Sequence, residues 1–247
     1  MGEGTVLKTE DLNYRDGDLD CRGFLAFDET LQGKRPGILV VHEAWGLGDH
    51  AMERAQMLAK LGYVALAADM YGGRRQATDL PTAMGLIGDL RTNPKKLRAR
   101  AGAAIAALKA LPNVDGGKLA AIGFCFGGTT VLELARGGAD LCGVVSFHGG
   151  LETAAPAEAG AVKAKVLVCT GADDPMIPPA QVVGFEEEMR QSGADWQVIA
   201  YGGTVHSFTN PHAGKVVALP GVVYNERSDK RSWATMRAFF DEIFGVS

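Results

Sequence analysis

One cysteine of this chain lies where a nucleophile could act. The segment Gly123-Phe124-Cys125-Phe126-Gly127 has the form G-x-C-x-G, follows an apolar run and precedes the helical pattern TTVLELAR. Between a strand and a helix, this spacing predicts a sharp turn in which side chains two positions either side of the nucleophile would clash, and glycine removes them. The turn would hold the sulfur at a helix N-terminus, where free N–H groups and the helix dipole favour the thiolate, the reactive form of cysteine.

The other three cysteines have a simpler interpretation. Cys21, Cys142 and Cys169 lie in strand-like runs, and a buried core position is a common fate of free cysteine. They show no C-x-x-C spacing and no dense disulfide framework, so we expect free thiols in a reducing cytoplasm. The same core interpretation for Cys125 would leave its two flanking glycines unexplained.

A cysteine nucleophile needs a general base, and the base needs a group that orients it. For a nucleophile on this kind of turn, the order along the chain is nucleophile, acid, histidine. GADDPMIPP (171–179) follows one predicted strand and contains Asp173 and Asp174, and GGTVHSF (202–208) follows the last and contains His206. Polar groups beyond the carboxyl ends of parallel strands gather at one edge of the sheet. We therefore predict His206 as the base, rather than a surface-loop histidine, and one of the two aspartates as its partner.

The remaining histidines suggest no chemistry of their own. His42 and His148 end apolar runs and His212 lies in a loop, so we give these three no catalytic role. No His-x-x-x-His pair on a helix is present in the sequence, and we expect neither a metal site nor a cofactor.

The elements that must position these residues follow from hydrophobic patterning. Short apolar runs predict strands buried on both faces; they are 37–42, 63–69, 118–123, 142–147, 165–170 and 196–201. Helical spacing predicts helices at 50–62, 94–111, 179–192 and 228–245, the last with Ser228 as its cap. This alternation predicts an α/β fold with a mostly parallel central sheet and helices on both faces.

The first 28 residues differ from the rest of the chain. TVLKTEDL and LDCRGFLAF flank Asp16-Gly17, which predicts an antiparallel hairpin at the sheet edge. We find no internal repeat, linker or composition break, so residues 1–247 are expected to form a single domain. The loop at 71–80 and the stretch at 202–227 are the two regions with little regular structure, and long loops are often functional.

Composition excludes several classes of function. A net charge of −4 argues against nucleic-acid binding, and the basic cluster at 91–100 is typical of a solvated helix face. The uncharged, apolar run 119–132 is too short to span a membrane, and the N-terminus lacks the apolar core of a signal peptide. We expect a cytoplasmic protein, and a monomer because no heptad or additional apolar stripe is visible.

Four segments together resemble one family. The sequences VVHEAWGL (40–47), GFCFGG (123–128), GADDPMIP (171–178) and YGGTVHSF (201–208) are similar to those of the dienelactone hydrolase family of α/β hydrolases. The resemblance extends from about residue 10 to the C-terminus. It implies a single-domain α/β hydrolase that cleaves a small ester or lactone (carboxymethylenebutenolidase type) with a Cys–His–Asp triad and no cofactor.

The resemblance also implies a role for individual residues. Cys125 is the nucleophile, His206 the base and Asp174 the orienting acid, with Asp173 as the alternative. In the family, a glutamate at the position of Glu43 contacts the resting cysteine and protects the thiol until substrate displaces it. A helix-capping or solvated surface acid is the other interpretation of Glu43.

The substrate site is suggested by residues near the same motifs. The backbone N–H groups of Ala44 and Phe126 occupy the positions from which the fold builds an oxyanion hole. The side chains of Trp45 and Phe126 are expected to line the acyl pocket, although both are also typical core residues.

Two features concern a substrate carboxylate, which members of the family bind with arginines. Arg74 and Arg75 in DMYGGRRQATD (69–79) are candidates for one such clamp, unless they are simply a solvated loop. A second family arginine is replaced here by Asn210, which removes a contact worth about 1.5–3 kcal/mol. Dienelactone itself is therefore not the expected physiological substrate. The alternative functions are a catalytically idle fold that binds a small molecule, and a thioesterase on the same scaffold.

Overall fold

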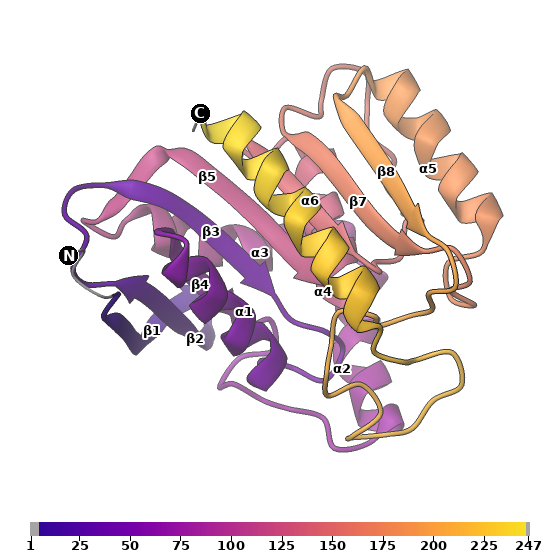
Figure 1. Ribbon diagram of the computed structural model, residues 1–247, viewed down its shortest axis with the longest axis horizontal. Coiled ribbons are helices and arrows are strands. Elements are labelled where there is room, and N and C mark those ends of the chain that lie inside the picture. Colours follow the sequence, from indigo (N-terminus) through magenta and orange to yellow (C-terminus); the bar gives the residue numbers. More distant parts are fainter. Residues whose placement is uncertain (1–4, 246–247) are drawn as a thin grey trace.

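An eight-stranded sheet forms the centre of the computed structural model, which describes residues 5–245 (Figure 1). The spatial order is β1-β2-β4-β3-β5-β6-β7-β8. The strands are β1 (Leu7–Asp16), β2 (Leu19–Asp28), β3 (Arg35–Val41), β4 (Val64–Ala68), β5 (Val114–Phe124), β6 (Gly143–Phe147), β7 (Lys165–Gly171) and β8 (Trp196–Tyr201). All pairings from β4 to β8 are parallel, whereas β1 and β2 are antiparallel to each other and β2 is antiparallel to β4. The predicted mostly parallel sheet is confirmed.

The expected hairpin lies at the sheet edge, with its turn one residue later than predicted. Asp16 pairs with Leu19, so the two turn residues are Gly17 and Asp18. Gly17 has φ of +58°, in the left-handed region that glycine enters without steric cost.

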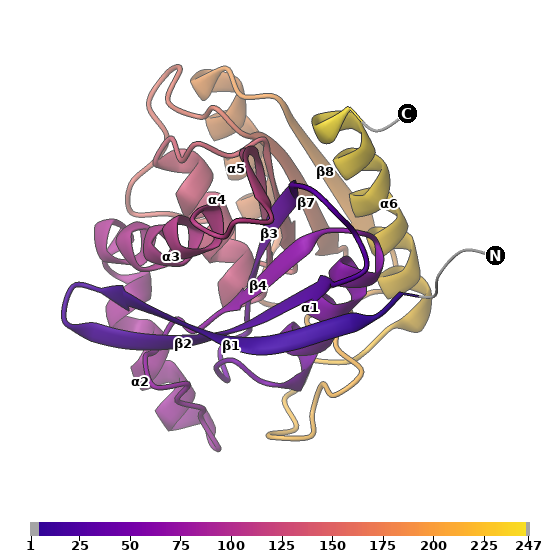
Figure 2. The ribbon, with the colours of Figure 1, turned by 90° about the vertical axis from the view of Figure 1, so that its left-hand side faces the viewer.

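Helices cover both faces of the sheet (Figure 2). They are α1 (Asp49–Lys60), α2 (Leu80–Arg91), α3 (Pro94–Lys109), α4 (Phe126–Arg136), α5 (Pro179–Ser192) and α6 (Glu226–Phe244). One buried cluster joins α1 and α6 to the sheet, and a second joins it to α2, α3, α4 and α5. Because both faces are covered, the central parallel strands β3, β4 and β6 are almost wholly apolar and buried.

The structure differs from the sequence prediction in one additional helix and in several element boundaries. Helix α2 was not predicted, although Asp79 caps it by accepting a hydrogen bond from the Thr82 N–H at 2.8 Å. Helix α6 begins at Glu226, and its cap is Asn225, which accepts from the Ser228 N–H at 3.1 Å. The predicted Ser228 cap is therefore wrong, since Ser228 already lies in the first turn. Strand β5 also begins at Val114 rather than at residue 118.

The segment between β8 and α6 contains no helix or named strand within the described chain, as predicted. Within this segment, an isolated β-bridge joins His206 to Val222. In Figure 1 it lies at the same end of the molecule as α2, beyond the carboxyl ends of the parallel strands.

The cysteines predicted for the core differ in exposure. Cys21 and Cys169 are buried and Cys142 is half-buried, and all four cysteines of the described chain are free thiols. Between residues 5 and 245, no helix combines the length and the apolar character needed to cross a membrane.

Candidate active site

Cys125 lies on the sharp turn between β5 and α4. Its backbone has φ of +54° and ψ of −115°, an unfavourable conformation for a residue with a side chain. A Cβ atom on Gly123 would lie 2.0 Å from the Gly127 carbonyl oxygen, and one on Gly127 would lie 2.1 Å from the Val41 carbonyl oxygen. Backbone atoms cannot yield by that much, so the two glycines are sterically required and the half-buried cysteine is held at the first turn of α4.

His206 is paired with Asp174. The imidazole Nδ1 lies 2.8 Å from the Asp174 Oδ2, and both side chains are buried. The second carboxylate oxygen accepts the Met176 N–H at 2.8 Å, which fixes the carboxylate. Asp173 is exposed, so of the two candidate aspartates the structure brings only Asp174 to the histidine.

The other imidazole nitrogen of His206 is free. Its Nε2 is buried and makes no hydrogen bond to a group in the described chain. Burial disfavours a charge on His206, but the neighbouring Cys125 and the hydrogen-bonded Asp174 outweigh it and raise the pKa of His206 to about 10.

Cys125 and His206 line one pocket of about 280 Å³. Its walls are mainly apolar and include α2, the loop after β3 and the segment between β8 and α6. The apolar lining residues are Ala44, Trp45, Leu80, Met84, Ile87, Leu97, Phe126, Met176, Ile177, Leu219 and Val222. Arg91, at the end of α2, is an exposed residue at the rim of the lining and has no side-chain hydrogen bond or ion pair with another described residue.

The contribution of α2 to this pocket is the main feature missing from the sequence analysis. The signals were present, because Asp79 precedes Leu80-Pro81 and Arg91 closes the helix. Gly85 and Gly88 obscured the helical pattern, since glycine is a poor helix former.

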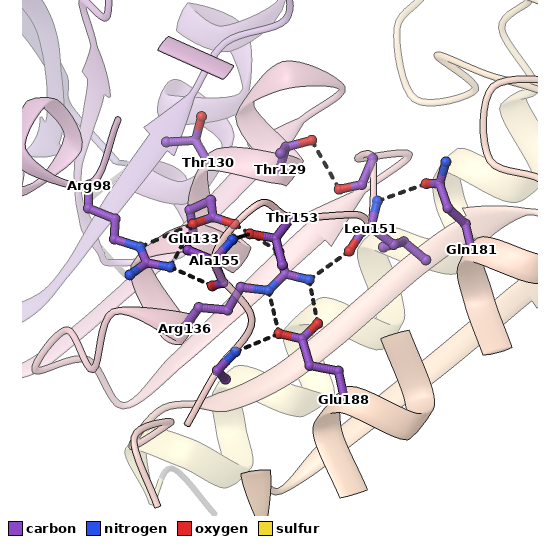
Figure 3. Close-up of polar contacts among 12 residues, drawn as sticks. Arg98, Thr129, Thr130, Glu133, Arg136, Leu151, Thr153, Ala155, Gln181 and Glu188 are labelled. Carbon is purple, nitrogen blue, oxygen red and sulfur yellow. Dashed lines mark hydrogen bonds and ion pairs between the residues drawn. The ribbon is translucent and has the colours of Figure 1, made fainter. Parts of the chain in front are cut away.

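The loop after β6 contributes Gly150 to the pocket lining and is bound to α4 and α5 (Figure 3). The Thr129 hydroxyl donates to the Gly150 carbonyl at 3.1 Å, and the Leu151 N–H donates to the Gln181 side chain at 3.0 Å. Arg136 binds the Leu151 carbonyl at 2.6 Å. Thr129, Gly150 and Gln181 all line the pocket, so these bonds set the position of its wall.

Glu43 is buried, but its carboxylate is not bound to the cysteine. One oxygen accepts the Ser207 hydroxyl at 3.0 Å, and the other accepts the Asn210 amide and lies 3.6 Å from His50 Nδ1. Burial opposes its ionisation, yet His50 and the Ser207 hydroxyl lower the pKa of Glu43 to about 2. The expected contact with the resting cysteine is absent from the hydrogen bonds of the described chain, and the solvated-acid alternative does not fit a buried carboxylate either. Asn210, where the family has an arginine, instead binds Glu43.

Two backbone N–H groups near the sulfur are free of acceptors. Among the described residues, nothing accepts a hydrogen bond from the N–H of Ala44 or Phe126. The Ala44 carbonyl accepts the Tyr71 hydroxyl at 2.9 Å, and the Tyr71 ring stacks on Phe126 with centroids 5.9 Å apart. The Ala44 peptide and the Phe126 side chain are therefore held in fixed positions.

Arg74 and Arg75 do not line the pocket. Arg74 forms an ion pair with Asp11 at 2.6 Å and donates to the Gly23 carbonyl at 2.8 Å, while Arg75 donates to the Tyr71 carbonyl at 3.0 Å. Both guanidinium groups are used to attach their own loop. This geometry does not support the expectation that they clamp a substrate carboxylate.

His148, which had no expected role, lies beside the nucleophile. It is fully buried, and its ring centroid is 5.2 Å from that of His206. The sequence offered no signal for this contact, because it depends on β6 being the neighbour of β5 in the sheet. Within residues 5–245, no three His, Cys, Asp or Glu side chains are arranged to hold a metal ion.

Comparison with known proteins gives a consistent result. The model of the dienelactone hydrolase family matches residues 21–244. A crystal structure described as a dienelactone hydrolase-like promiscuous phosphotriesterase from metagenomic libraries is 45% identical, with a TM-score of 0.91, and the match covers 96% of this chain and 98% of that one.

Curated relatives are more distant. An uncharacterized protein of Caenorhabditis elegans, K02A2.1, is 38% identical over 154 residues, which cover 60% of this chain and 95% of the relative. A protein of Methylorubrum extorquens whose name includes carboxymethylenebutenolidase is 30% identical over 186 residues, which cover 71% of this chain and 64% of the relative.

Proposed function

This chain belongs to the dienelactone hydrolase family, a family of hydrolases, and we propose that it hydrolyses small carboxylic esters or lactones with Cys125 as nucleophile and His206 as base. One observation carries the proposal. The cysteine on the glycine-flanked turn and the Asp174-bound histidine line the same, mainly apolar pocket. A nucleophile, a base and an orienting carboxylate in one cavity are what acyl transfer requires.

The first half of the reaction forms an acyl-enzyme. The Cys125 thiolate attacks the substrate carbonyl carbon, and the resulting oxyanion is stabilised by the free N–H groups of Ala44 and Phe126. The carbon–oxygen bond to the leaving group then breaks, and the His206 imidazolium donates its proton to the departing oxygen. The product at this stage is a thioester on Cys125 and a free alcohol or enol.

The second half releases the acid. Neutral His206 takes a proton from a water molecule, and the hydroxide attacks the thioester carbonyl. The carbon–sulfur bond breaks, and the thiolate leaves beside the regenerated imidazolium. Asp174, bound to Nδ1, keeps the imidazole oriented with Nε2 towards the sulfur throughout.

The choice of cysteine restricts the substrate. A thiolate leaves a tetrahedral intermediate more readily than an alkoxide does, so the intermediate returns to the starting ester unless the leaving oxygen is stabilised. We therefore expect turnover of enol lactones and aryl esters, and slow turnover of alkyl esters. A comparison of 4-nitrophenyl acetate with ethyl acetate tests this, and similar kcat/KM for the two would contradict it.

The nucleophile itself is tested by substitution. Cys125→Ala is expected to abolish ester turnover, whereas Cys142→Ala, which replaces a half-buried thiol outside the pocket, is expected to retain it. Iodoacetamide should inactivate the wild type and the Cys142 variant at the same rate. Activity that survives Cys125→Ala would assign the nucleophile elsewhere. The absence of thiol-sensitive turnover on any ester or thioester would favour a binding function instead.

A second substrate class is suggested by the phosphotriesterase description of the 45% identical structure. A thiolate that attacks carbon can also attack phosphorus, provided that the leaving oxygen is stabilised. Diethyl 4-nitrophenyl phosphate is expected to release nitrophenolate in the wild type and not in Cys125→Ala. Equal release by both proteins would exclude this activity.

A further inference from the structure

We propose that His148 is a positioning residue that joins the nucleophile turn to the loop carrying His206, and that it does so through Thr209. The inference rests on the proposed roles of Cys125 and His206 in ester hydrolysis. It assigns a role to a buried histidine that the reaction itself does not use.

The contacts of His148 define its protonation state. Its Nδ1 accepts the backbone N–H of Cys125 at 3.1 Å, a proton shared with the Phe147 carbonyl at 3.0 Å. Because Nδ1 accepts, the ring hydrogen is on Nε2, which lies 2.8 Å from the Thr209 hydroxyl oxygen and donates to it. Both nitrogens of the neutral imidazole are therefore hydrogen-bonded, Nδ1 to the nucleophile turn and Nε2 to the loop that carries His206.

The surroundings keep this ring neutral. Burial first, and then the nearby positive charge of His206, His50 and Arg54, lower the pKa of His148 well below its usual value; Glu43 acts in the opposite direction but is outweighed. A proton on Nδ1 would break the bond from the Cys125 N–H to the ring and leave that N–H to the Phe147 carbonyl. The bridge is therefore intact whenever His206 is cationic.

Thr209 is fixed from its other side as well. It lies three residues after His206 in the same loop, and its carbonyl accepts from Arg54. Arg54 in turn forms an ion pair with Asp229 of α6 at 2.7 Å. The bond from His148 therefore reaches an anchored point of the loop, which lets it set the distance between the nucleophile and the base.

Backbone strain is concentrated at the same place. In the described chain, four non-glycine residues have positive φ, and three of them are Cys125 (+54°), His148 (+41°) and Ser207 (+55°). Such conformations persist only where the surroundings over-determine them. The bond from Cys125 to His148 contributes to that determination at the nucleophile turn, and the bond from His148 to Thr209 does so two residues after Ser207, whose hydroxyl is held by Glu43.

The alternative is that His148 is an ordinary core residue, and that its two hydrogen bonds only satisfy its own ring nitrogens.

Two variants separate these roles. His148→Asn retains an acceptor near the Cys125 N–H and tolerates the left-handed backbone, but its side chain is too short to reach Thr209. Thr209→Val removes the hydroxyl and preserves the shape of the side chain. Each variant breaks the same link from a different end.

Thr170→Val is the matched control. Thr170 is as buried as Thr209, but its hydroxyl has no hydrogen-bond partner in the described chain. The experiment measures kcat and KM with 4-nitrophenyl acetate, the rate of Cys125 alkylation by iodoacetamide, and the melting temperature of each variant.

His148→Asn and Thr209→Val are each expected to lower kcat about 10- to 100-fold with little change in KM, as a displaced catalytic pair would. Both variants are expected to slow alkylation. The double variant should lose no more kcat than either single variant. Thr170→Val should match the wild type in kcat and in alkylation rate. Wild-type kcat and alkylation in Thr209→Val, or an equal loss in Thr170→Val, would overturn the inference. If His148→Asn does not fold, the two threonine variants decide. If the wild type itself has no Cys125-dependent turnover, the proposed function fails, and the alkylation rates still test the bridge.

Discussion

The protonation of His206 depends on two single residues, Cys125 and Asp174, which together raise its pKa to about 10 against the opposing effect of burial. Cys125→Ser removes the thiolate charge while preserving the size of the side chain. The pKa of His206 is then expected to fall from about 10 towards the ordinary histidine value of 6.5, with Asp174 still opposing the fall. An NMR titration of the imidazole measures this change, and Cys142→Ser is the control. An unchanged pKa would mean that the sulfur does not interact with the ring.

We predict that Arg91 influences which substrate charge the pocket accepts. It lines the pocket and has no partner among the described residues, so its guanidinium is available to a substrate carboxylate. Arg91→Met is expected to raise KM about tenfold or more for a nitrophenyl ester that bears a carboxylate, because a charge-assisted hydrogen bond contributes about 1.5–3 kcal/mol. KM for a neutral nitrophenyl ester should not change. Arg74→Met, which alters a residue outside the pocket, should leave both values as they are, and a similar effect of the two substitutions would contradict the assignment.

Helices α4 and α5 are joined to the pocket wall by a buried charged group (Figure 3). Arg136 binds Glu188 through two bonds of 2.8 Å and Glu133 at 3.1 Å, and Arg98 binds the other oxygen of Glu133 at 2.8 Å. The Glu188 carboxylate also accepts the Ala157 N–H at 2.9 Å. These bonds hold three helices, α3, α4 and α5, and the loop between β6 and β7 in one arrangement.

Removal of Arg136 therefore has an effect on whole elements. Arg136→Met leaves Glu188 without a cationic partner and Glu133 with Arg98 alone, and we expect a loss of about 3–5 kcal/mol in the free energy of unfolding. Arg190→Met is the control, because Arg190 pairs with Glu186 and Glu187 on the exposed face of α5 and such pairs contribute less than about 1 kcal/mol. Urea unfolding measures both variants, and equal losses would show that the buried group has no special role.

Across the whole molecule, buried titratable groups make stability depend on pH. Burial lowers the pKa of His42 from 6.5 to about 4. Below pH 6.5 the unfolded chain takes up a proton that the folded protein excludes, so stability falls by up to about 1.4 kcal/mol per pH unit for this residue. Glu43, with a pKa lowered from 4.5 to about 2, contributes stability that is present above pH 4.5 and is lost as the pH falls towards 2.

Urea unfolding at pH 7, 5 and 4 is expected to show a progressive decrease in the free energy of unfolding. Glu43→Gln should reduce the slope below pH 4.5 while leaving the slope between pH 6.5 and 5 unchanged, because that part comes from the histidines. A free energy that stays constant from pH 7 to 4 would contradict the predicted protonation states.

The sequence predicted those features that depend on neighbouring residues. The need for Gly123 in the turn at Cys125 is local, since a Cβ there would lie 2.0 Å from the Gly127 carbonyl oxygen, whereas the clash at Gly127 is with Val41 of β3 and depends on how the sheet packs. The parallel strands follow from short apolar runs, and the order of acid and histidine from the loops that end them. Helix α2 was missed for a local reason too, since Gly85 and Gly88 weaken the pattern that Asp79 begins.

The tertiary structure decided which side chains meet. Asp174 rather than Asp173 reaches His206, Glu43 binds Ser207 and Asn210, and Arg74 turns to Asp11. The contact of His148 with the nucleophile depends on β6 lying beside β5. Each of these contacts joins residues far apart in the chain, so it is set by strand order, side-chain direction and burial, which exist only once the whole domain has packed.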